Sequence, residues 1–294
     1  ETKKTYFDSV KTLIDAGVSI GTYTLMMNQG AELGRHEAIK KYGLKSKWRI
    51  VPRDFGIYWG KKVFDVECVC VETNTMSYKE YLECRRFSLL LSFFSYPIFV
   101  PLKRLMKNEL KMSYFKFIFS IYKGLEKNRN KSNNNLQGKL FKTYSEFSKE
   151  CEKELFNSKE DLFEFYSKDE NYNKLMSAEL GDNLARKYAA KIIGNALTET
   201  IDFSINLILE MIQKETVNKQ ETKNFLESLR LWLKNLYISV LSRFTGKILL
   251  IWALLKKRKS HHLLIMESLS SPQKNYYEKL QKSKKRLLLY FDLV

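Results

Sequence analysis

The chain has 294 residues, of which 44% are hydrophobic and 14% are aromatic. This is enough apolar material for one large or two small packed domains, so the composition excludes a globally disordered protein. The formal net charge of +18 favours an anionic partner. However, the lysines are spread along the chain rather than gathered in one block, which is typical of solvated helix faces. Four cysteines are too few for a disulfide scaffold and indicate a reducing, cytoplasmic compartment.

Residues 1–45 predict a fragment of a parallel α/β sheet. Apolar residues within 5–16 recur on one helix face, and Gly17 is typical of a helix end. Residues 18–27 are rich in β-branched and aromatic side chains and predict a buried strand, which the turn residues 28–30 follow. A single strand of this kind lacks neighbours. Since the first residue is also not Met, we expect the chain to be part of a longer protein, and no secretory signal is predicted.

Residues 46–75 predict a β-hairpin. Its strands are expected at 47–51 and 61–71, separated by a loop at 52–56 and a turn at Trp59 and Gly60. Together with the helices on either side, the hairpin makes the expected fold class α+β and mostly α-helical.

Residues 76–294 predict a helical C-terminal region. Ser77 and Glu80 have the spacing of a capping box, so a helix is expected from this point to about Ser95, before Pro97. A polar linker is predicted near 128–138. Further helices are expected at 103–125, 140–156, 159–168, 173–193, 195–215 and 219–237, the last opened by a cap pair of Asn218 and Glu221, and one more is expected after Ser271 and Pro272.

Residues 236–255 are long and apolar enough to suggest a membrane span, but Arg243 and Lys247 interrupt them. Each charge costs roughly 2.5–3.5 kcal/mol at a bilayer centre, so a buried or interfacial helix is favoured. The basic run at 256–259 favours a solvated helix end, where cations complement the helix dipole. It would also suit anionic lipid head groups, so peripheral membrane contact stays open as an alternative.

No residue is assigned a catalytic or metal-binding role. Cys68 and Cys70 share one face of a predicted strand and are either half of a metal site or two buried small hydrophobes. The adjacent His261 and His262 do not have the spacing of a helical metal pair.

Charged residues surround the predicted hairpin and the capped helix. Arginines 49, 53, 85 and 86 lie near glutamates 67, 72 and 83 in the sequence. They either pair with one another or form a rim that clamps a carboxylate or phosphate of a substrate. The rim candidates are Arg49, Arg53, Glu72, Tyr81 and Arg85.

Four segments together resemble a known family. They are GTYTLMMNQGAELG at 21–34, the pattern Arg-x-x-Pro-x-x-Phe-Gly at 49–56, VETNTMSYKEYLECRRF at 71–87, and GDNLARKYAAKI at 181–192. In order and spacing they are similar to the C-terminal half of cobalamin-dependent radical S-adenosylmethionine (SAM) enzymes. The resemblance covers residues 5–95 well and 175–193 weakly.

The resemblance implies that residues 1–45 end a partial β/α barrel and that the helical tail helps to close an active site. It implies SAM, a 4Fe–4S cluster and cobalamin as cofactors, with Leu25, Met27, Gly30 and Glu32 as candidates beside the SAM adenosine. The family's three-cysteine cluster motif and its cobalamin motif are both absent from this chain. The resemblance therefore implies that the missing N-terminal part of a parent enzyme holds both groups, and that this chain alone is inactive.

The substrate stays open among a peptide, a lipid, a sugar and another small molecule, and no nucleic-acid partner is expected in this interpretation. The alternative is a stand-alone basic helical protein that binds an anionic membrane surface or nucleic acid. That alternative predicts binding that weakens steeply with salt.

Overall fold

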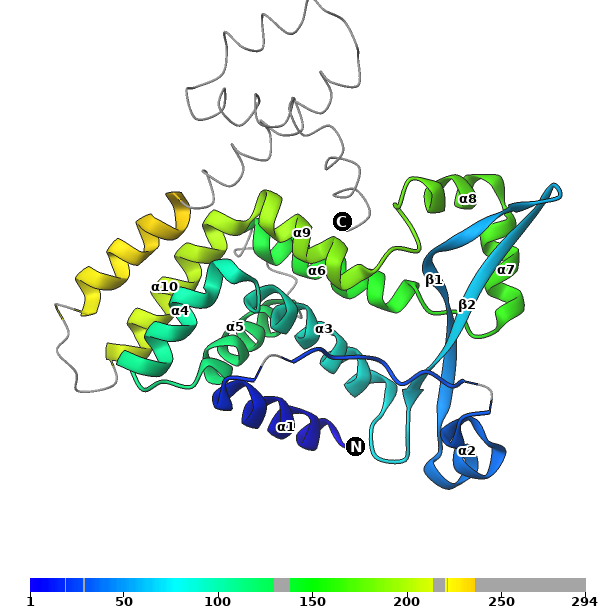
Figure 1. The fold of residues 1–294 in the computed structure, drawn as a ribbon, viewed down its shortest axis with the longest axis horizontal. Coiled ribbons are helices and arrows are strands. Elements are labelled where there is room, and N and C mark those ends of the chain that lie inside the picture. The colour runs from blue at the N-terminus through cyan, green and yellow to red at the C-terminus, as the bar shows by residue number, and fades with distance from the viewer. Residues whose placement is uncertain (19, 29, 130–137, 214–219, 221, 236–294) are drawn as a thin grey trace, which may run out of the picture. The chain divides into compact units, whose positions relative to one another are not determined.

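The computed structural model describes residues 1–18, 20–28, 30–129, 138–213, 220 and 222–235. The chain divides into one unit at Glu1–Arg230 and a second at Leu231–Val294, and the elements below belong to the first. Figure 1 shows them as coloured ribbons. They are α1 (Lys3–Ala16), the short 3-10 helix η1 (Glu32–Gly34), α2 (His36–Tyr42), β1 (Lys45–Tyr58), β2 (Lys61–Glu72), α3 (Tyr78–Phe94), η2 (Pro97–Phe99), α4 (Val100–Arg104), the π-helical turn η3 (Leu105–Glu109), α5 (Tyr114–Arg129), α6 (Lys139–Lys153), α7 (Lys159–Ser167), α8 (Asp169–Met176), α9 (Leu184–Asn195) and α10 (Leu197–Gln213).

The described residues are mostly helical, with one two-stranded antiparallel sheet, which confirms the α+β, mostly α-helical class. The helix predicted at 5–16 is α1. It ends as expected at Gly17, which adopts the left-handed conformation with φ 90°.

The prediction that residues 18–27 form a buried strand of a parallel sheet is wrong. The residues described there follow an extended path that contacts β2 through one antiparallel bridge, between Met26 and Val69. Two backbone hydrogen bonds hold it, from Met27 N to Cys68 O and from Cys70 N to Leu25 O, both 2.8 Å. Residues with high β propensity need partners on both sides to form a buried strand, and among the described residues only β2 supplies one. Tyr23 is consequently 95% exposed.

The predicted hairpin is confirmed, but its first strand is longer than expected. Strand β1 continues through 52–56, which the sequence predicted as a loop, and reaches the turn at Trp59 and Gly60. The register jumps from Ile50, paired with Val66, to Phe55, paired with Phe64. The extra residues form a bulge, in which Arg53 has φ 66°.

The free edge of β1 also has a backbone partner. Trp48 of β1 exchanges two 2.8 Å backbone hydrogen bonds with Phe156, which follows α6. One face of the hairpin packs on α7 and α8 in a cluster of six buried residues. Its members are Ile50, Phe64, Leu162, Tyr166, Tyr172 and Leu175.

Helix α3 begins at the predicted capping box. The Ser77 hydroxyl accepts from the Glu80 amide, and the Glu80 carboxylate accepts from the Ser77 amide at 3.0 Å. The helix ends at Phe94, as expected. It contacts α1, α5, α6 and α9, and the buried ring of Phe87 lies 4.9 Å from that of Phe7 on α1, measured between centroids. Burying such rings is the main stabilisation of this helical part.

Two predicted helices are broken. The helix expected at 103–125 becomes α4, η3 and α5, because Lys111 takes φ 52° and Asp15 caps α5. The Asp15 carboxylate accepts hydrogen bonds from the Ser113 hydroxyl and the Phe115 amide. The helix expected at 173–193 divides into α8 and α9, where Gly181 has φ 67° and Asn183 caps α9.

The helices predicted at 140–156, 159–168 and 195–215 correspond to α6, α7 and α10. Residues 222–235 are helical, within the helix predicted at 219–237. Several predictions lie outside the described residues. They concern most of the linker at 128–138, the cap pair at 218 and 221, the apolar run at 236–255, the basic run at 256–259, the histidines at 261 and 262, and the last helix.

Within the described ranges, no single helix is both long and apolar enough to cross a membrane. Two sharply bent helix pairs, α3 with Pro97–Glu109 and α9 with α10, meet those criteria only when each pair is taken together.

Candidate functional site

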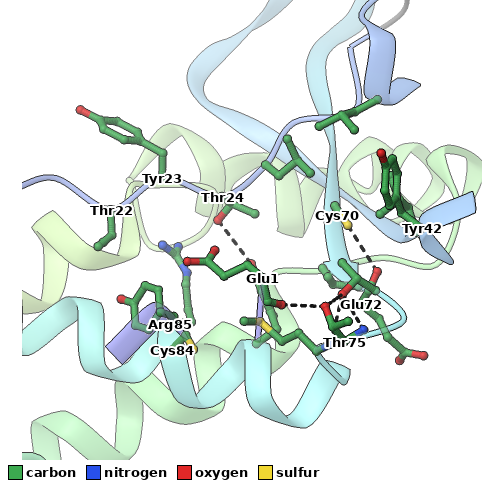
Figure 2. A pocket seen from close by; sticks show the side chains of 18 of the residues that line it. Glu1, Thr22, Tyr23, Thr24, Tyr42, Cys70, Glu72, Thr75, Cys84 and Arg85 are labelled. Carbon is green, nitrogen blue, oxygen red and sulfur yellow. Dashed lines mark hydrogen bonds between the residues drawn. The ribbon is translucent and has the colours of Figure 1, made fainter. Parts of the chain in front are cut away.

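A cavity of about 520 Å³ lies between the extended segment at 20–27, the end of β2 and helix α3. We call it the main cavity. Figure 2 shows residues 22–24 passing across it, with Arg85 and Cys84 on the α3 side. Apolar side chains dominate its wall, and Tyr6 of α1 also reaches it. The volume falls in the range that small organic ligands occupy.

A second, more polar cavity of about 390 Å³ lies on the other side of the same segment. Residues 22–24, Arg85 and Ser88 line both cavities, so they form the partition between them. Strand β1 contributes Arg49, and the start of α9 with the residues before it contributes 181–186.

A network of ion pairs supports the second cavity. Arg49 Nε donates to Glu67 at 2.5 Å across the hairpin, and Arg85 Nη2 donates to Glu154 at 3.1 Å. Glu154 also lies 3.9 Å from Arg49 Nη1, so a single carboxylate links β1 to α3. All four side chains are largely buried, and each charge therefore depends on its partner.

Burial controls the protonation of the groups around the main cavity. It raises the pKa of the Cys84 thiol to about 12 and raises the pKa values of the Tyr6 and Tyr81 hydroxyls. Burial lowers the pKa of Arg85, but attraction to Glu154 outweighs it and the net pKa is raised. At neutral pH the wall therefore presents a neutral thiol, neutral phenols and a guanidinium cation.

The structure separates the four candidates for SAM contact. Leu25 lines the main cavity, and Met27 is half-buried beside β2. Gly30 and Glu32 are exposed and do not line either of these two cavities.

The rim candidates also lie in different places. Arg49 and Arg85 meet at the second cavity, whereas Glu72 and Tyr81 line the main one. Arg53 is 73% exposed and lies 3.8 Å from Asp182. Glu67 and Glu154 form ion pairs with the two buried guanidinium groups. Of the two interpretations of Arg49 and Arg85, pairing within the protein therefore fits better than a clamp for a substrate anion.

Other charged candidates pair elsewhere. Glu72 accepts from Lys45 at 2.5 Å, which lowers the pKa of the glutamate, and Glu83 accepts from Lys3 at 2.9 Å. Arg86 is buried and pairs with Glu126 at 2.8 Å.

The cysteines do not fit a 4Fe–4S cluster. Cys70 is buried with its thiol toward the Glu72 carbonyl at 3.4 Å, and Cys84 and Cys151 are buried on separate helices. No group of three metal-ligating side chains occurs in the part of the chain that the structure describes. The cysteines of this chain therefore give such a cluster no set of ligands.

Sequence reasoning missed Tyr6, the hydroxyls of Thr22 and Thr24, Glu154 and Asp182. A capping signal at Asn183 marked the neighbourhood of Asp182, since Asn before an apolar run is a helix N-cap. Glu154 carries no local signal, because its partners are 69 or more positions away.

No family model matches the chain, and no curated protein matches it.

Proposed function

We propose that this chain is the C-terminal, substrate-enclosing part of a cobalamin-dependent radical SAM enzyme, and that the two cavities beside residues 22–24 are its share of the active site. In this proposal other sequence of the enzyme holds the cluster and the corrin, which supply the radical and the methyl group. The residues of this chain orient the substrate and exclude water.

One observation carries the proposal. The four segments that resemble the family are far apart in the sequence, yet all of them line the two adjoining cavities. The segments 21–34 and 71–87 supply most of the main cavity, and 49–56 and 181–192 supply much of the second. Convergence of this kind is typical of a ligand site rather than of general packing.

The first test is the coding sequence that precedes residue 1 in the gene. The proposal expects a cobalamin-binding domain and the three-cysteine cluster motif there. The protein encoded by that whole reading frame, reconstituted with iron and sulfide without oxygen, should cleave SAM to 5′-deoxyadenosine. A reading frame without the three-cysteine motif would contradict the proposal.

The second test concerns the residues carried over from the family. Glu32 is exposed outside the two cavities but directly precedes Leu33, which lines the main cavity, and the proposal places the Glu32 carboxylate beside the SAM adenosine. In the whole enzyme, Glu32→Gln should weaken SAM binding by roughly tenfold, equivalent to about 1.4 kcal/mol. Glu37→Gln, a nearby exposed acid on α2, is the matched control and should leave SAM affinity unchanged. Equal SAM affinity in both variants would remove Glu32 from the site.

A further inference from the structure

A third cavity lies between the end of α1, the segment that runs from α4 to η3, and the start of α5. We call it the lysine cavity, and its volume is about 330 Å³. None of its described lining residues lines either of the two cavities beside residues 22–24. They are Ile14, Asp15, Lys103, Lys107, Lys111, Met112, Ser113 and Tyr114.

Three lysines, Lys103, Lys107 and Lys111, reach this cavity from α4, from η3 and from the turn before α5. Among the described residues, none of their ammonium groups forms an ion pair with a carboxylate. Lys107 Nζ donates to the Ala16 carbonyl at 3.3 Å, and Lys103 Nζ lies 6.0 Å from the centroid of the Tyr114 ring. Because an ammonium group has three N–H donors, each lysine keeps donors for a ligand.

The acidic groups near the cavity do not balance these cations. Asp15, the one carboxylate among the described lining residues, accepts hydrogen bonds from the Ser113 hydroxyl at 2.8 Å and from the Phe115 amide at 3.3 Å. It lies at the N-terminus of α5, where the helix dipole stabilises an anion. The C-terminus of α1 adds a partial negative charge, which Lys107 contacts. Glu109 is exposed and does not line the cavity. The wall therefore has a net positive charge.

This charge selects the class of ligand. Several ammonium groups around one space favour an anion with several oxygen atoms, because each oxygen can accept a charge-assisted hydrogen bond. A phosphate group meets this requirement, since it carries about two negative charges and three acceptor oxygens. The formal net charge of +18 on the whole chain adds a long-range attraction for such a ligand.

We propose that the lysine cavity binds the phosphate group of an anionic ligand, which Lys103, Lys107 and Lys111 hold. A free phosphorylated molecule and an anionic lipid head group offer the same chemistry, and the two probes below distinguish them. The site goes beyond the radical SAM assignment, because it shares no described residue with the two cavities of the proposed active site and needs neither SAM nor a cluster.

The first probe is inorganic pyrophosphate, titrated into the purified chain by calorimetry. Salt at about 0.15 M screens non-specific attraction between exposed charges. The cavity variant carries Lys103→Gln, Lys107→Gln and Lys111→Gln together, and it should bind at least roughly tenfold more weakly than the wild type. Circular dichroism and the melting temperature establish that the variant folds.

A matched surface variant separates this site from the overall charge of the chain. It carries Lys142→Gln, Lys149→Gln and Lys153→Gln, which replace three exposed lysines of α6 that line none of the three cavities. It loses the same charge as the cavity variant, yet its affinity should change by less than about twofold. An equal loss of affinity in the two variants would overturn the proposal, because net charge alone would then explain the binding.

The second probe is a vesicle of phosphatidylcholine with phosphatidic acid, in a sedimentation assay. If the phosphate group belongs to a lipid, the wild type and the surface variant should sediment with these vesicles, the cavity variant should not, and pyrophosphate should give no heat. Binding of pyrophosphate identifies a free phosphorylated ligand. Both results support the site, whereas binding of neither probe by the wild type would overturn it.

Methyl signals in nuclear magnetic resonance locate the bound probe. Ile14 and Met112 line the lysine cavity, whereas Met176 on α8 is 66% exposed and does not. Pyrophosphate, or dihexanoyl phosphatidic acid if only the vesicles bind, should shift the signals of Ile14 and Met112 and leave that of Met176 in place. Unshifted signals of Ile14 and Met112 with the probe bound would overturn the proposal. This readout uses the wild-type chain, so it stands even if the cavity variant fails to fold.

Discussion

The helical part of the first unit and its hairpin part are built in different ways. Helices α3, α5, α6 and α9 bury aromatic rings such as Phe87, Phe117, Phe147 and Tyr188 completely and contact one another along their lengths. The hairpin and the segment at 20–27 instead have two cavities, an open turn with a fully exposed Trp59, and charges held in pairs. The difference teaches that the helices around α3 close into a core of buried rings, while the hairpin packs on one face only and leaves two cavities beside the segment at 20–27.

The largest expected effect separates a buried ion pair from an exposed one. Arg86 in α3 is 3% exposed and pairs with Glu126, so Arg86→Ala removes a buried guanidinium from beside that carboxylate. We expect a loss of about 3–5 kcal/mol in the free energy of unfolding, measured with urea. Arg53→Ala on the hairpin should cost about 0–1 kcal/mol, because that arginine is 73% exposed. Similar losses in the two variants would contradict the division into two parts.

Alkaline pH should also weaken the helical part. Burial raises the pKa of the Cys84 and Cys151 thiols to about 12, from an ordinary value of 9.0. Below pH 9 the folded and unfolded states both keep the protons. Between pH 9 and 12 only the unfolded state releases them, so stability falls as pH rises, by about 1.4 kcal/mol per pH unit for each thiol.

Urea titrations at a series of pH values measure this slope. In the double variant Cys84→Ala and Cys151→Ala, the free energy of unfolding should decrease less steeply with pH, because the two thiols no longer contribute to the slope. A folded chain in which iodoacetamide modifies Cys84 rapidly at pH 9 would contradict the burial on which this prediction depends.

A smaller effect is expected where the chain turns between α8 and α9. Gly181 has φ 67°, and an added Cβ would collide with Leu175 and approach Ile50 Cγ2 to 2.9 Å. Gly181→Ala should therefore cost about 3 kcal/mol, the upper range for strained backbone. Gly30→Ala has a similar φ of 84° but open space around it, and about 1 kcal/mol is expected. Equal losses would indicate that the space beside Gly181 is not filled.

The smallest effect tests the start of α3. Ser77→Ala removes the cap and should cost about 1 kcal/mol in thermal or urea unfolding, whereas Ser92→Ala at an exposed position of the same helix should be near neutral. Hydrogen bonds from the Ser77 amide and hydroxyl lower the pKa of Glu80. The contribution of that carboxylate is thus present above pH 4.5 and is lost as pH falls through its lower, folded-state pKa. Equal acid sensitivity of wild type and Glu80→Gln would contradict this role.

Local chemistry made the start of α3, the end of α1 and the hairpin turn predictable. Ser77 with Glu80, Gly17, and Trp59 with Gly60 each determine backbone geometry within a few residues. The segment at 18–27 was predicted wrongly because its β propensity requires neighbouring strands, and the sequence of the segment does not contain them.

The site was predictable only in part for the same reason. Tyr81, Glu72 and Arg85 were identified from their place near a conspicuous cap, and the structure brings them to the main cavity. Tyr6 and Glu154 reach the two cavities through tertiary contacts of helices, for which no short motif exists.

The account depends most directly on the segment at 20–27 lying along β2, because that contact encloses the main cavity. Hydrogen exchange resolved by residue measures it through the amides of Met27 and Cys70, which donate to Cys68 and Leu25. Both amides should exchange far more slowly than that of the exposed Tyr23. Exchange of Met27 and Cys70 at the rate of an unstructured peptide would show that the segment leaves β2 open, and the main cavity with its proposed place in the active site would be refuted.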